Sequence, residues 1–297
     1  MINLHLNRPR HTSRRETQVA FYGGSFTGLP RSRQEELLQA VAPFLKNGQV
    51  DTIRLSTRPD CIDRQTVSFL KRHGVGTVEL GVQSMDPAVL EIARRGHTVG
   101  DTEKAISCIL NESIQVGAQL MIGLPGESTS GLLAGVRKIV ALRPDFARIY
   151  PTVVLAGSSL EKLYQRGEYR PLSLLEAVAG AVKFREILEN AGIPVYRTGL
   201  QHTDSLEESI VAGPYHPSFG EMVLSRGLFN KVRRVLQRTR DMRHRRLVIS
   251  SRDKSLFIGK DKMNVKRLDK LGLLNGVVFE FERSQPRQCV KLITDRD

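Results

Sequence analysis

The sequence predicts an α/β protein with a parallel sheet, followed by a small basic α+β segment. Short β-branched and apolar runs alternate with longer helical patterns between residues 19 and 197. This alternation is typical of βα units, whose parallel strands either close into a barrel or stay open and doubly wound. Basic residues are concentrated further along, because residues 226–267 hold 15 Lys or Arg against three Asp, or +12 of the net charge of +14. We therefore expect two domains, residues 1–225 and residues 226–297.

The strands of the first domain are predicted from short apolar runs bounded by polar or glycine-rich segments. They are residues 19–22, 52–55, 76–80, 117–122, 147–150 and 194–197. The connecting segments 32–48 and 86–96 carry apolar residues at helical spacing, so we expect helices there.

The pattern changes after residue 201. Residues 212–223 form a Gly/Pro/aromatic stretch that we expect to be a loop, and residues 228–246 form a basic helix-like run. Strands are predicted near 246–250, 277–282 and 289–293. These elements make up a small basic α+β appendage.

Composition places the chain among cytoplasmic proteins with a buried core. Hydrophobic residues make up 40% of the sequence, and no apolar run approaches the ~20 residues of a membrane helix. The basic N-terminus lacks the apolar segment of a secretory signal. The three cysteines, Cys61, Cys108 and Cys289, lie too far apart to predict a disulfide framework or a metal site.

Polar or glycine-rich clusters follow successive predicted strands. They read GGSFTG (23–28), STRPD (56–60), GVQS (81–84) and GLPGES (123–128). Ligands of parallel α/β proteins bind at the carboxyl ends of the strands, so these clusters predict the rim of a small-molecule site. Glycine lets a ligand approach the backbone closely, and we expect Gly23 and Gly24 to form one wall.

Two charged residues near this rim are candidate functional groups. Arg58 precedes a proline and presents a guanidinium suited to a carboxylate, although a salt bridge to Asp60 or Glu79 explains it equally well. Glu79 lies inside an apolar strand, where a buried acid needs a partner. We expect Glu79 to be functional.

The motifs GGSFTG, TRPD, ELGVQS, RGHT and GLPG, in this order, resemble the radical SAM domain of the catalytic subunit of Elongator. They are still more similar to its shorter bacterial relatives, as is the YHPSFGE stretch. The resemblance extends from about residue 18 to residue 223. It implies a partial (β/α)6 TIM-like barrel that binds S-adenosylmethionine across the strand ends.

The resemblance also implies roles for individual residues. It places the methionine amino group beside the loop at Gly23, Gly24 and Ser25. The ribose and sulfonium then lie beside the strand that includes Glu79, and the adenine lies beside the turn that begins at Gly123. The expected cofactor-binding residues are Gly23, Gly24, Ser25, Arg58, Glu79, Gln83, Ser84 and Gly123. In the family, a [4Fe-4S] cluster reduces the sulfonium, and the 5′-deoxyadenosyl radical then abstracts a hydrogen from substrate.

The sequence departs from the family at the cluster. A triplet of closely spaced cysteines on the loop after the first strand holds the cluster, and this sequence has no such triplet. We expect that VAFYGG (19–24) is the second strand of the barrel and that the first βα unit is lacking. The expected enzyme is then inactive as this chain, being either a truncated gene product or a non-catalytic remnant. The alternative function is an RNA-binding or regulatory protein on a degenerate radical SAM barrel.

The basic segment predicts a nucleic-acid partner, with tRNA as the candidate, because clustered positive charge attracts phosphate backbones. A solvated helical face is the alternative explanation. LFIGKDKMNVKRL (256–268) is expected to be a glycine at the end of a strand, a basic loop and a helix. It resembles the RNA-clamping loop of KH domains, except that Lys262 replaces the second loop glycine. The nucleic-acid candidates are Arg233, Arg234, Arg245, Arg246, Lys260 and Lys262.

Overall fold

The computed structural model describes residue 2, residues 16–242 and residues 244–294. Contacts divide the chain into two compact units. The first consists of Met1–Thr152, Lys162–Arg170 and Ile187–Arg197, and the second of Val153–Glu161, Pro171–Glu186 and Thr198–Asp297. We describe each unit by itself.

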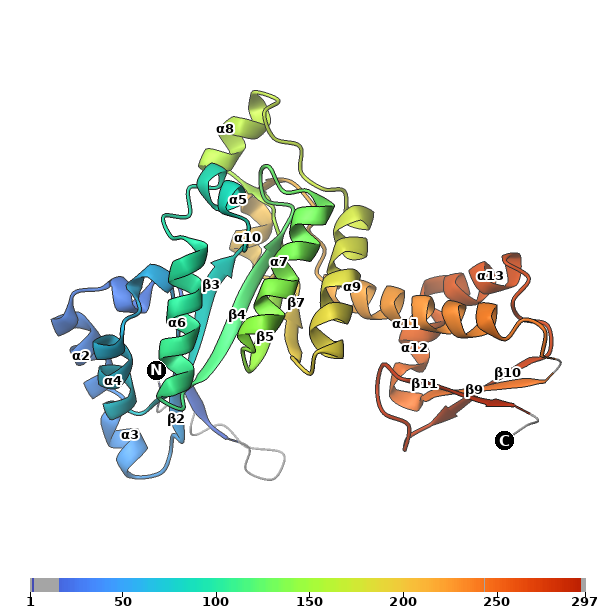
Figure 1. Cartoon of the computed structure of the whole chain (residues 1–297), viewed down its shortest axis with the longest axis horizontal. Helices are drawn as coiled ribbons and strands as arrows, with labels where there is room; N and C mark the ends of the chain where they lie inside the picture. Colours follow the sequence, from blue (N-terminus) through green and yellow to red (C-terminus); the bar gives the residue numbers. More distant parts are fainter. Residues whose placement is uncertain (1, 3–15, 243, 295–297) are drawn as a thin grey trace. The chain divides into compact units, whose positions relative to one another are not determined.

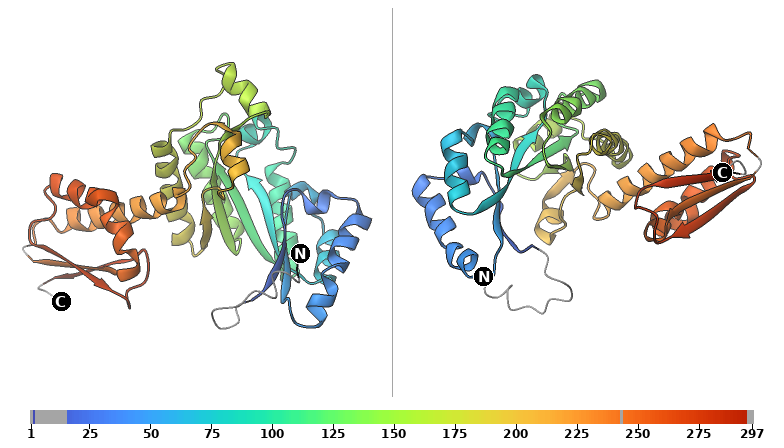
Figure 2. Two further views of the ribbon diagram at one scale, coloured as in Figure 1. Left: turned by 180° about the vertical axis from the view of Figure 1, so that it is seen from behind. Right: turned by 60° about the horizontal axis from the view of Figure 1, so that its bottom comes forward.

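The first unit is built on six parallel strands that curl into a half-barrel (Figures 1 and 2). The spatial order of the strands, β1-β2-β3-β4-β5-β7, follows their order in the sequence. The strands are β1 (Gln18–Phe21), β2 (Thr52–Thr57), β3 (Val75–Gln83), β4 (Gln115–Ile122), β5 (Phe146–Pro151) and β7 (Val195–Thr198). All six strands predicted from the sequence are confirmed, as is the partial-barrel fold.

Helices connect these strands and cover one face of the sheet (Figure 1). They are η1 (Phe26–Gly28), α2 (Arg31–Gln39), α3 (Ala42–Lys46), η2 (Pro59–Cys61), α4 (Arg64–Arg72), α5 (Pro87–Ile92), α6 (Val99–Asn111) and α7 (Thr129–Leu142). Side-chain caps start several of them: Asp63 accepts from the Thr66 N–H, and Thr98 and Asp101 form a capping box. The continuous helix expected over residues 32–48 is instead α2 followed by α3, with Pro43 placed at the start of α3.

Residues 154–212 supply five further elements around β7. They are β6 (Val154–Leu155), α8 (Ser159–Gln165), α9 (Leu174–Asn190), α10 (Asp204–Ser209) and β8 (Ile210–Ala212). Strands β6 and β8 pair antiparallel in a two-stranded sheet.

The C-terminal part of the second unit has its own core. Its elements are α11 (Phe219–Arg238), β9 (Arg245–Ser250), η3 (Ser251–Asp253), α12 (Lys254–Ile258), η4 (Lys260–Lys262), α13 (Met263–Lys270), β10 (Val277–Glu282) and β11 (Val290–Thr294). Strand β9 lies between β10, to which it is parallel, and β11, to which it is antiparallel. Leu228, Phe229 and Val232 of α11 pack with Leu247 and Ile249 of β9 in this core.

Two expectations for this region are wrong. Helix α11 begins at Phe219, inside the segment expected to be a loop, because Phe219 and Val223 are buried one turn apart. The glycine of the KH-like stretch follows a helix and not a strand, since residues 254–258 are α12 with Phe257 buried. The three predicted strands are confirmed. Residue 225 lies within α11, so a separate domain from residue 226 onward stays a prediction.

Among the described residues, no helix combines the length and apolar character of a membrane span.

Candidate functional site

The six-stranded sheet has one apolar and one polar face. Side chains of a strand alternate between the faces. On β2, Ile53 and Leu55 are completely buried, whereas Arg54 between them is partly exposed. On β3, Val78 and Leu80 are buried in the same way on either side of Glu79. The polar face therefore carries charged groups in the middle of the sheet.

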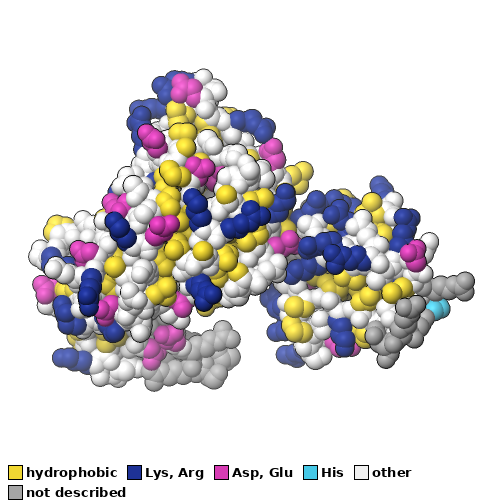
Figure 3. All heavy atoms as spheres, viewed as in Figure 1, with side chains coloured by type: hydrophobic (Ala, Val, Ile, Leu, Met, Phe, Trp, Pro, Cys, Tyr) yellow, Lys and Arg dark blue, Asp and Glu magenta, His cyan; other side chains and the backbone are white. Residues whose placement is uncertain are grey.

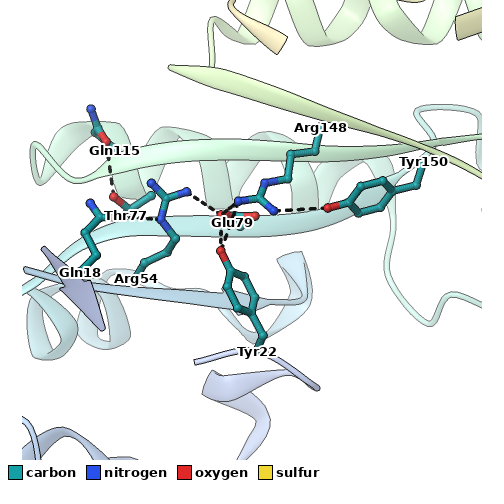
Figure 4. A network of polar contacts seen from close by, with 8 residues as sticks. All are labelled: Gln18, Tyr22, Arg54, Thr77, Glu79, Gln115, Arg148 and Tyr150. Atoms are coloured by element: carbon teal, nitrogen blue, oxygen red, sulfur yellow. Dashed lines mark hydrogen bonds and ion pairs between the residues drawn. The ribbon is translucent and has the colours of Figure 1, made fainter. Parts of the chain in front are cut away.

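Glu79 is the centre of a network on this face (Figure 4). Its side chain is only 3% exposed, and Oε1 accepts three hydrogen bonds. The donors are Nη1 of Arg54 at 2.7 Å, Nη2 of Arg148 at 2.9 Å and the hydroxyl of Tyr22 at 2.8 Å. The partner that the sequence required for Glu79 is thus supplied by β2, β5 and the loop after β1.

The arginines reach further side chains. Nε of Arg54 donates to Oε1 of Gln18 at 2.9 Å, and Nη1 of Arg148 donates to the hydroxyl of Tyr150 at 3.3 Å. Nε of Arg148 is buried without a hydrogen-bond partner. Two guanidinium groups against one carboxylate leave this network with one excess positive charge, which suits an anionic group.

Tyr22 connects the network to solvent. The residue is 53% exposed, yet its hydroxyl contacts the buried Glu79 carboxylate. Burial of that hydroxyl, followed by its hydrogen bond to Glu79, raises the pKa of Tyr22 above its ordinary value. Tyr22 therefore stays neutral and acts as a donor at ordinary pH.

The glycine loop lies beside Tyr22, at the carboxyl end of β1. Gly23 has a φ of 105°, a conformation that side chains other than glycine rarely adopt. A Cβ added at Gly23 or Gly24 would meet no atom within 4 Å. These residues, Ser25 and the neighbouring apolar side chains line a cavity of about 220 Å³. The loop thus leaves open space that a ligand can occupy.

Arg58, after β2, is engaged by a neighbour. Its Nε and Nη2 donate to the two carboxylate oxygens of Asp60 at 2.9 and 2.6 Å, and Nη2 also donates to the carbonyl of Gly96 at 3.0 Å. The structure therefore contains the Asp60 salt bridge that the sequence left open. A cofactor role for Arg58 stays a prediction. In that role the guanidinium would have to bind the cofactor as well as Asp60.

Gln83 and Ser84 end β3 in an irregular conformation. Gln83 is 4% exposed and has a φ of 64°, which is strained for a residue with a side chain. Its Oε1 accepts from Nε2 of Gln119 at 3.3 Å, and the Ser84 hydroxyl accepts from the Asp86 N–H at 3.1 Å. A register shift in the β3–β4 pairing precedes Gln83. Strain of this kind is often found at functional sites.

Gly123 begins the turn after β4 and is held from two sides. Its N–H donates to Oε2 of Glu127 at 2.6 Å, and its carbonyl accepts from the Tyr169 hydroxyl at 2.7 Å. Burial raises the pKa of Glu127 to about 7, despite the backbone hydrogen bonds that favour its ionised form. The carboxyl group of Glu127 therefore changes its charge near neutral pH.

The parallel sheet gathers the predicted residues at one edge. Gly23, Arg58, Gln83 and Gly123 each lie at or directly after the carboxyl end of a different strand. Glu79 lies further down β3, inside the sheet. Binding of S-adenosylmethionine by these residues stays a prediction.

Sequence reasoning missed the residues that complete the Glu79 network. Arg54, Arg148, Tyr22 and Tyr150 all lie within predicted strands, and the sequence pattern gives none of them a functional role. A signal was present, because a charged residue inside an otherwise apolar strand must be paired. The sequence does not tell which donors meet, since they lie 25 and 69 positions from Glu79.

The cysteines do not form a cluster site. Cys61 ends η2, Cys108 lies in α6, and Cys289 lies in the second unit. Within the described ranges, no group of three His, Cys, Asp or Glu side chains is arranged to hold a metal ion. The residues present therefore do not fit a [4Fe-4S] cluster, which needs several thiolates around it.

The nucleic-acid candidates differ in environment. Arg234 ion-pairs with Glu186 at 2.8 Å, and Arg246 ion-pairs with Glu280 at 3.3 Å. Arg245 is only 4% exposed, and its guanidinium donates to the carbonyls of Leu236 and Asn275. Contact of Arg245 with RNA stays a prediction, which its burial and these two hydrogen bonds disfavour.

The remaining candidates lie on α11 and the loop before α13. Arg233 is half-buried, and its Nε has no hydrogen-bond partner. Lys262 is exposed, with a φ of 59°, directly before α13. Lys260 begins η4, and its side chain lies outside the described part of the structure.

Comparison with known proteins gives matches over most of the chain. Residues 10–134 match the Radical SAM superfamily, and residues 144–227 match the Radical SAM C-terminal domain. An uncharacterized protein of Methanocaldococcus jannaschii is 31% identical over 225 residues, which is 74% of this chain and 66% of that protein. The tRNA uridine(34) acetyltransferase of the same organism is 33% identical over 57% of this chain and 31% of its own length.

A solved structure agrees with these matches. It is the Elp3 protein of Methanocaldococcus infernus in a form with an N-terminal deletion. Its TM-score is 0.61 at 26% identity, covering 70% of this chain and 53% of that chain. The chain thus spans about half of this structure and about a third of the acetyltransferase.

Proposed function

The chain belongs to the radical SAM superfamily, with similarity to its Elongator-like members, and we propose that its half-barrel binds S-adenosylmethionine along the carboxyl edge of the sheet. The observation that supports this most directly is the glycine loop after β1. Gly23 has a positive φ and open space where a side chain would be. In this proposal Gly23, Gly24 and Ser25 receive the methionine amino group, and Gly123 lies beside the adenine.

The polar face beneath this edge supports an anionic or polar ligand. Arg54 and Arg148 are held in place by Glu79, so their orientation costs no further ordering when a ligand arrives. Tyr22, which stays neutral, supplies a hydroxyl between the glycine loop and Glu79.

In the family, S-adenosylmethionine and a [4Fe-4S] cluster together supply the 5′-deoxyadenosyl radical. The three dispersed cysteines of this sequence do not fit that cluster, so we derive no radical step from its residues. The cytoplasmic location stays a prediction.

The proposed substrate class is tRNA, contacted by basic residues between 226 and 267. The support is the name of a relative, a tRNA uridine(34) acetyltransferase, together with the +12 charge of this segment. The alternative is a non-catalytic RNA-binding or regulatory protein on the same fold. The scattered cysteines favour that alternative if no partner segment exists.

Substitution of Gly23 tests the cofactor proposal. Gly23→Ala adds a methyl group that meets no protein atom, so it should interfere with a ligand more than with the fold. Gly48→Ala is the matched control, because Gly48 also has a positive φ and open space but lies before β2 at the amino end of the sheet. Both variants should lose stability by about 1 kcal/mol from backbone strain.

Calorimetric titration with S-adenosylmethionine reads out the result. We expect at least about tenfold weaker binding in the Gly23 variant, a difference of about 1.4 kcal/mol, and no change in the Gly48 variant. The same affinity in both variants, or no binding by the unaltered chain, would refute the proposed cofactor site.

A further inference from the structure

Three arginines of the second unit lie together without an acidic partner, and we propose that this cluster is where the chain contacts the phosphate backbone of RNA. The cluster consists of Arg226 and Arg233 on α11 and Arg267 on α13. This inference rests on the RNA part of the proposed function and identifies its contact surface. Arg226 and Arg267 were not among the residues predicted from the sequence.

The cluster is organised around one aromatic ring. The guanidinium groups of Arg226 and Arg267 lie 5.7 and 4.7 Å from the ring centre of Phe229, which is 1% exposed. The Asn264 side chain donates to the Ser225 hydroxyl at 3.0 Å and so fixes α13 against α11. Two charges from different helices are thereby held on one surface.

The positive charge of the cluster is not neutralised by the protein. Three other arginines of this unit pair with acids: Arg234 with Glu186, Arg246 with Glu280 and Arg287 with Asp253. In the described part of the chain, no such ion pair is formed by Arg226, Arg233 or Arg267.

The cluster repels itself in the absence of a ligand. Burial lowers the pKa of Arg226, and the positive charges of Arg267 and then Arg233 lower it further. Nε of Arg233 is buried without a hydrogen-bond partner. An anion bound beside these arginines would reduce the repulsion between their positive charges.

The spacing of the cluster favours a chain of phosphates over a single one. Arg226 and Arg233 are seven residues apart on one helix, which corresponds to about 10 Å along its axis. Guanidinium groups bind phosphate oxygens in a bidentate manner. Exposed Lys262 and Lys266 of the adjoining loop and helix extend the positive surface. Figure 3 shows Lys and Arg side chains gathered over these C-terminal elements.

A pair of matched double variants of the full chain tests the inference. Arg226→Gln with Arg267→Gln removes two unpaired charges, and Arg234→Gln with Arg246→Gln removes two paired ones. Both change the net charge by the same amount. A third variant, Arg226→Lys with Arg267→Lys, keeps the charge and removes only the guanidinium fork.

Affinity for unfractionated tRNA is measured for each chain across a series of salt concentrations. We expect the first double variant to bind at least about tenfold more weakly, with the slope of log affinity against log salt reduced by about 1.4 to 1.8, two contacts at about 0.7 to 0.9 each. The control variant should keep its affinity within about threefold. The lysine variant should bind more weakly but keep the slope, and thermal unfolding checks that each variant is folded.

Two failures are distinguishable. If the unaltered chain binds tRNA and the first double variant keeps both affinity and slope, the cluster is not the contact surface and only this inference is overturned. If the unaltered chain binds no tRNA, the RNA part of the proposed function is overturned together with the cluster.

Discussion

Glu79 is the residue on which the polar face of the half-barrel depends. A buried carboxylate is costly unless its charge is paired and hydrogen-bonded. Here one oxygen of Glu79 accepts from Arg54, Arg148 and Tyr22, which come from three different parts of the sheet. The requirement to pair one acid therefore fixes the orientation of three side chains on the face that we propose faces the ligand.

Glu127 provides a pH-dependent prediction at the scale of a single residue. Its folded pKa is about 7, above the ordinary value of 4.5, so the folded chain binds the proton more tightly than the unfolded chain. The sign follows from linkage: Glu127 contributes nothing below pH 4.5 and lowers the free energy of unfolding as pH rises from 4.5 to 7. We expect this loss to be at most about 3 kcal/mol.

Glu127→Gln isolates this effect, because an amide accepts the Gly123 hydrogen bond but does not titrate. Urea unfolding of both chains between pH 4 and pH 8 gives the difference in stability. The free energy of unfolding of the variant should rise relative to that of the unaltered chain between pH 4.5 and pH 7. Above pH 7 the difference between the two should stay constant. A difference that does not vary with pH would contradict the raised pKa.

Arg245 gives a prediction at the scale of elements. Its guanidinium donates to the Leu236 carbonyl near the end of α11 and to the Asn275 carbonyl before β10, so it connects a helix with two strands. A cation near a helix C-terminus is also favoured by the helix dipole. Arg245→Gln should therefore destabilise the second unit by roughly 1–3 kcal/mol, measured by urea unfolding.

Arg246→Gln is the control on the neighbouring position. Its side chain is half exposed and pairs with a partly exposed Glu280, so its removal should cost less than about 1 kcal/mol. Neither variant should alter tRNA affinity under conditions where the chain is folded. Weaker tRNA binding by folded Arg245→Gln, with little loss of stability, would return Arg245 to the contact surface.

The strands were predictable from the sequence because their signal is local. Short buried runs such as 117–122 are bounded by polar segments, and the structure places β4 at Gln115–Ile122. The sequence does not predict an element boundary that depends on tertiary contacts. Helix α11 begins at Phe219 because Phe219 and Val223 pack into a core, which a Gly- and Pro-rich stretch does not reveal.

The candidate site was predictable only in part, for a related reason. Glycines and polar residues after strands gather at one edge whenever the strands are parallel, so Gly23, Gln83 and Gly123 were identifiable. The partners of Glu79 depend on strand register, such as the pairing of Arg54 with Thr77 across β2 and β3. Arg234 and Arg246 likewise differ from the unpaired arginines because each pairs with an acid far away in the sequence. The sequence pattern does not indicate these ion pairs.

At the scale of the whole molecule, the two units divide the cysteines. Cys61 and Cys108 belong to the first unit, in η2 and α6, and Cys289 belongs to the second. An iron–sulfur cluster needs several thiolates arranged around one core. Neither unit by itself therefore holds three cysteines for such a cluster.

We expect that this chain, reconstituted anaerobically with iron and sulfide, does not acquire a [4Fe-4S] cluster. The first unit holds two cysteines and the second unit one, whereas a cluster needs several thiolates around one core. A variant with Cys61, Cys108 and Cys289 all replaced by Ser measures adventitious iron, and the unaltered chain should bind no more than this control. Roughly four irons per chain, together with absorbance lost in the Cys-to-Ser control, would mean that the cysteines come together in a way the structure does not contain.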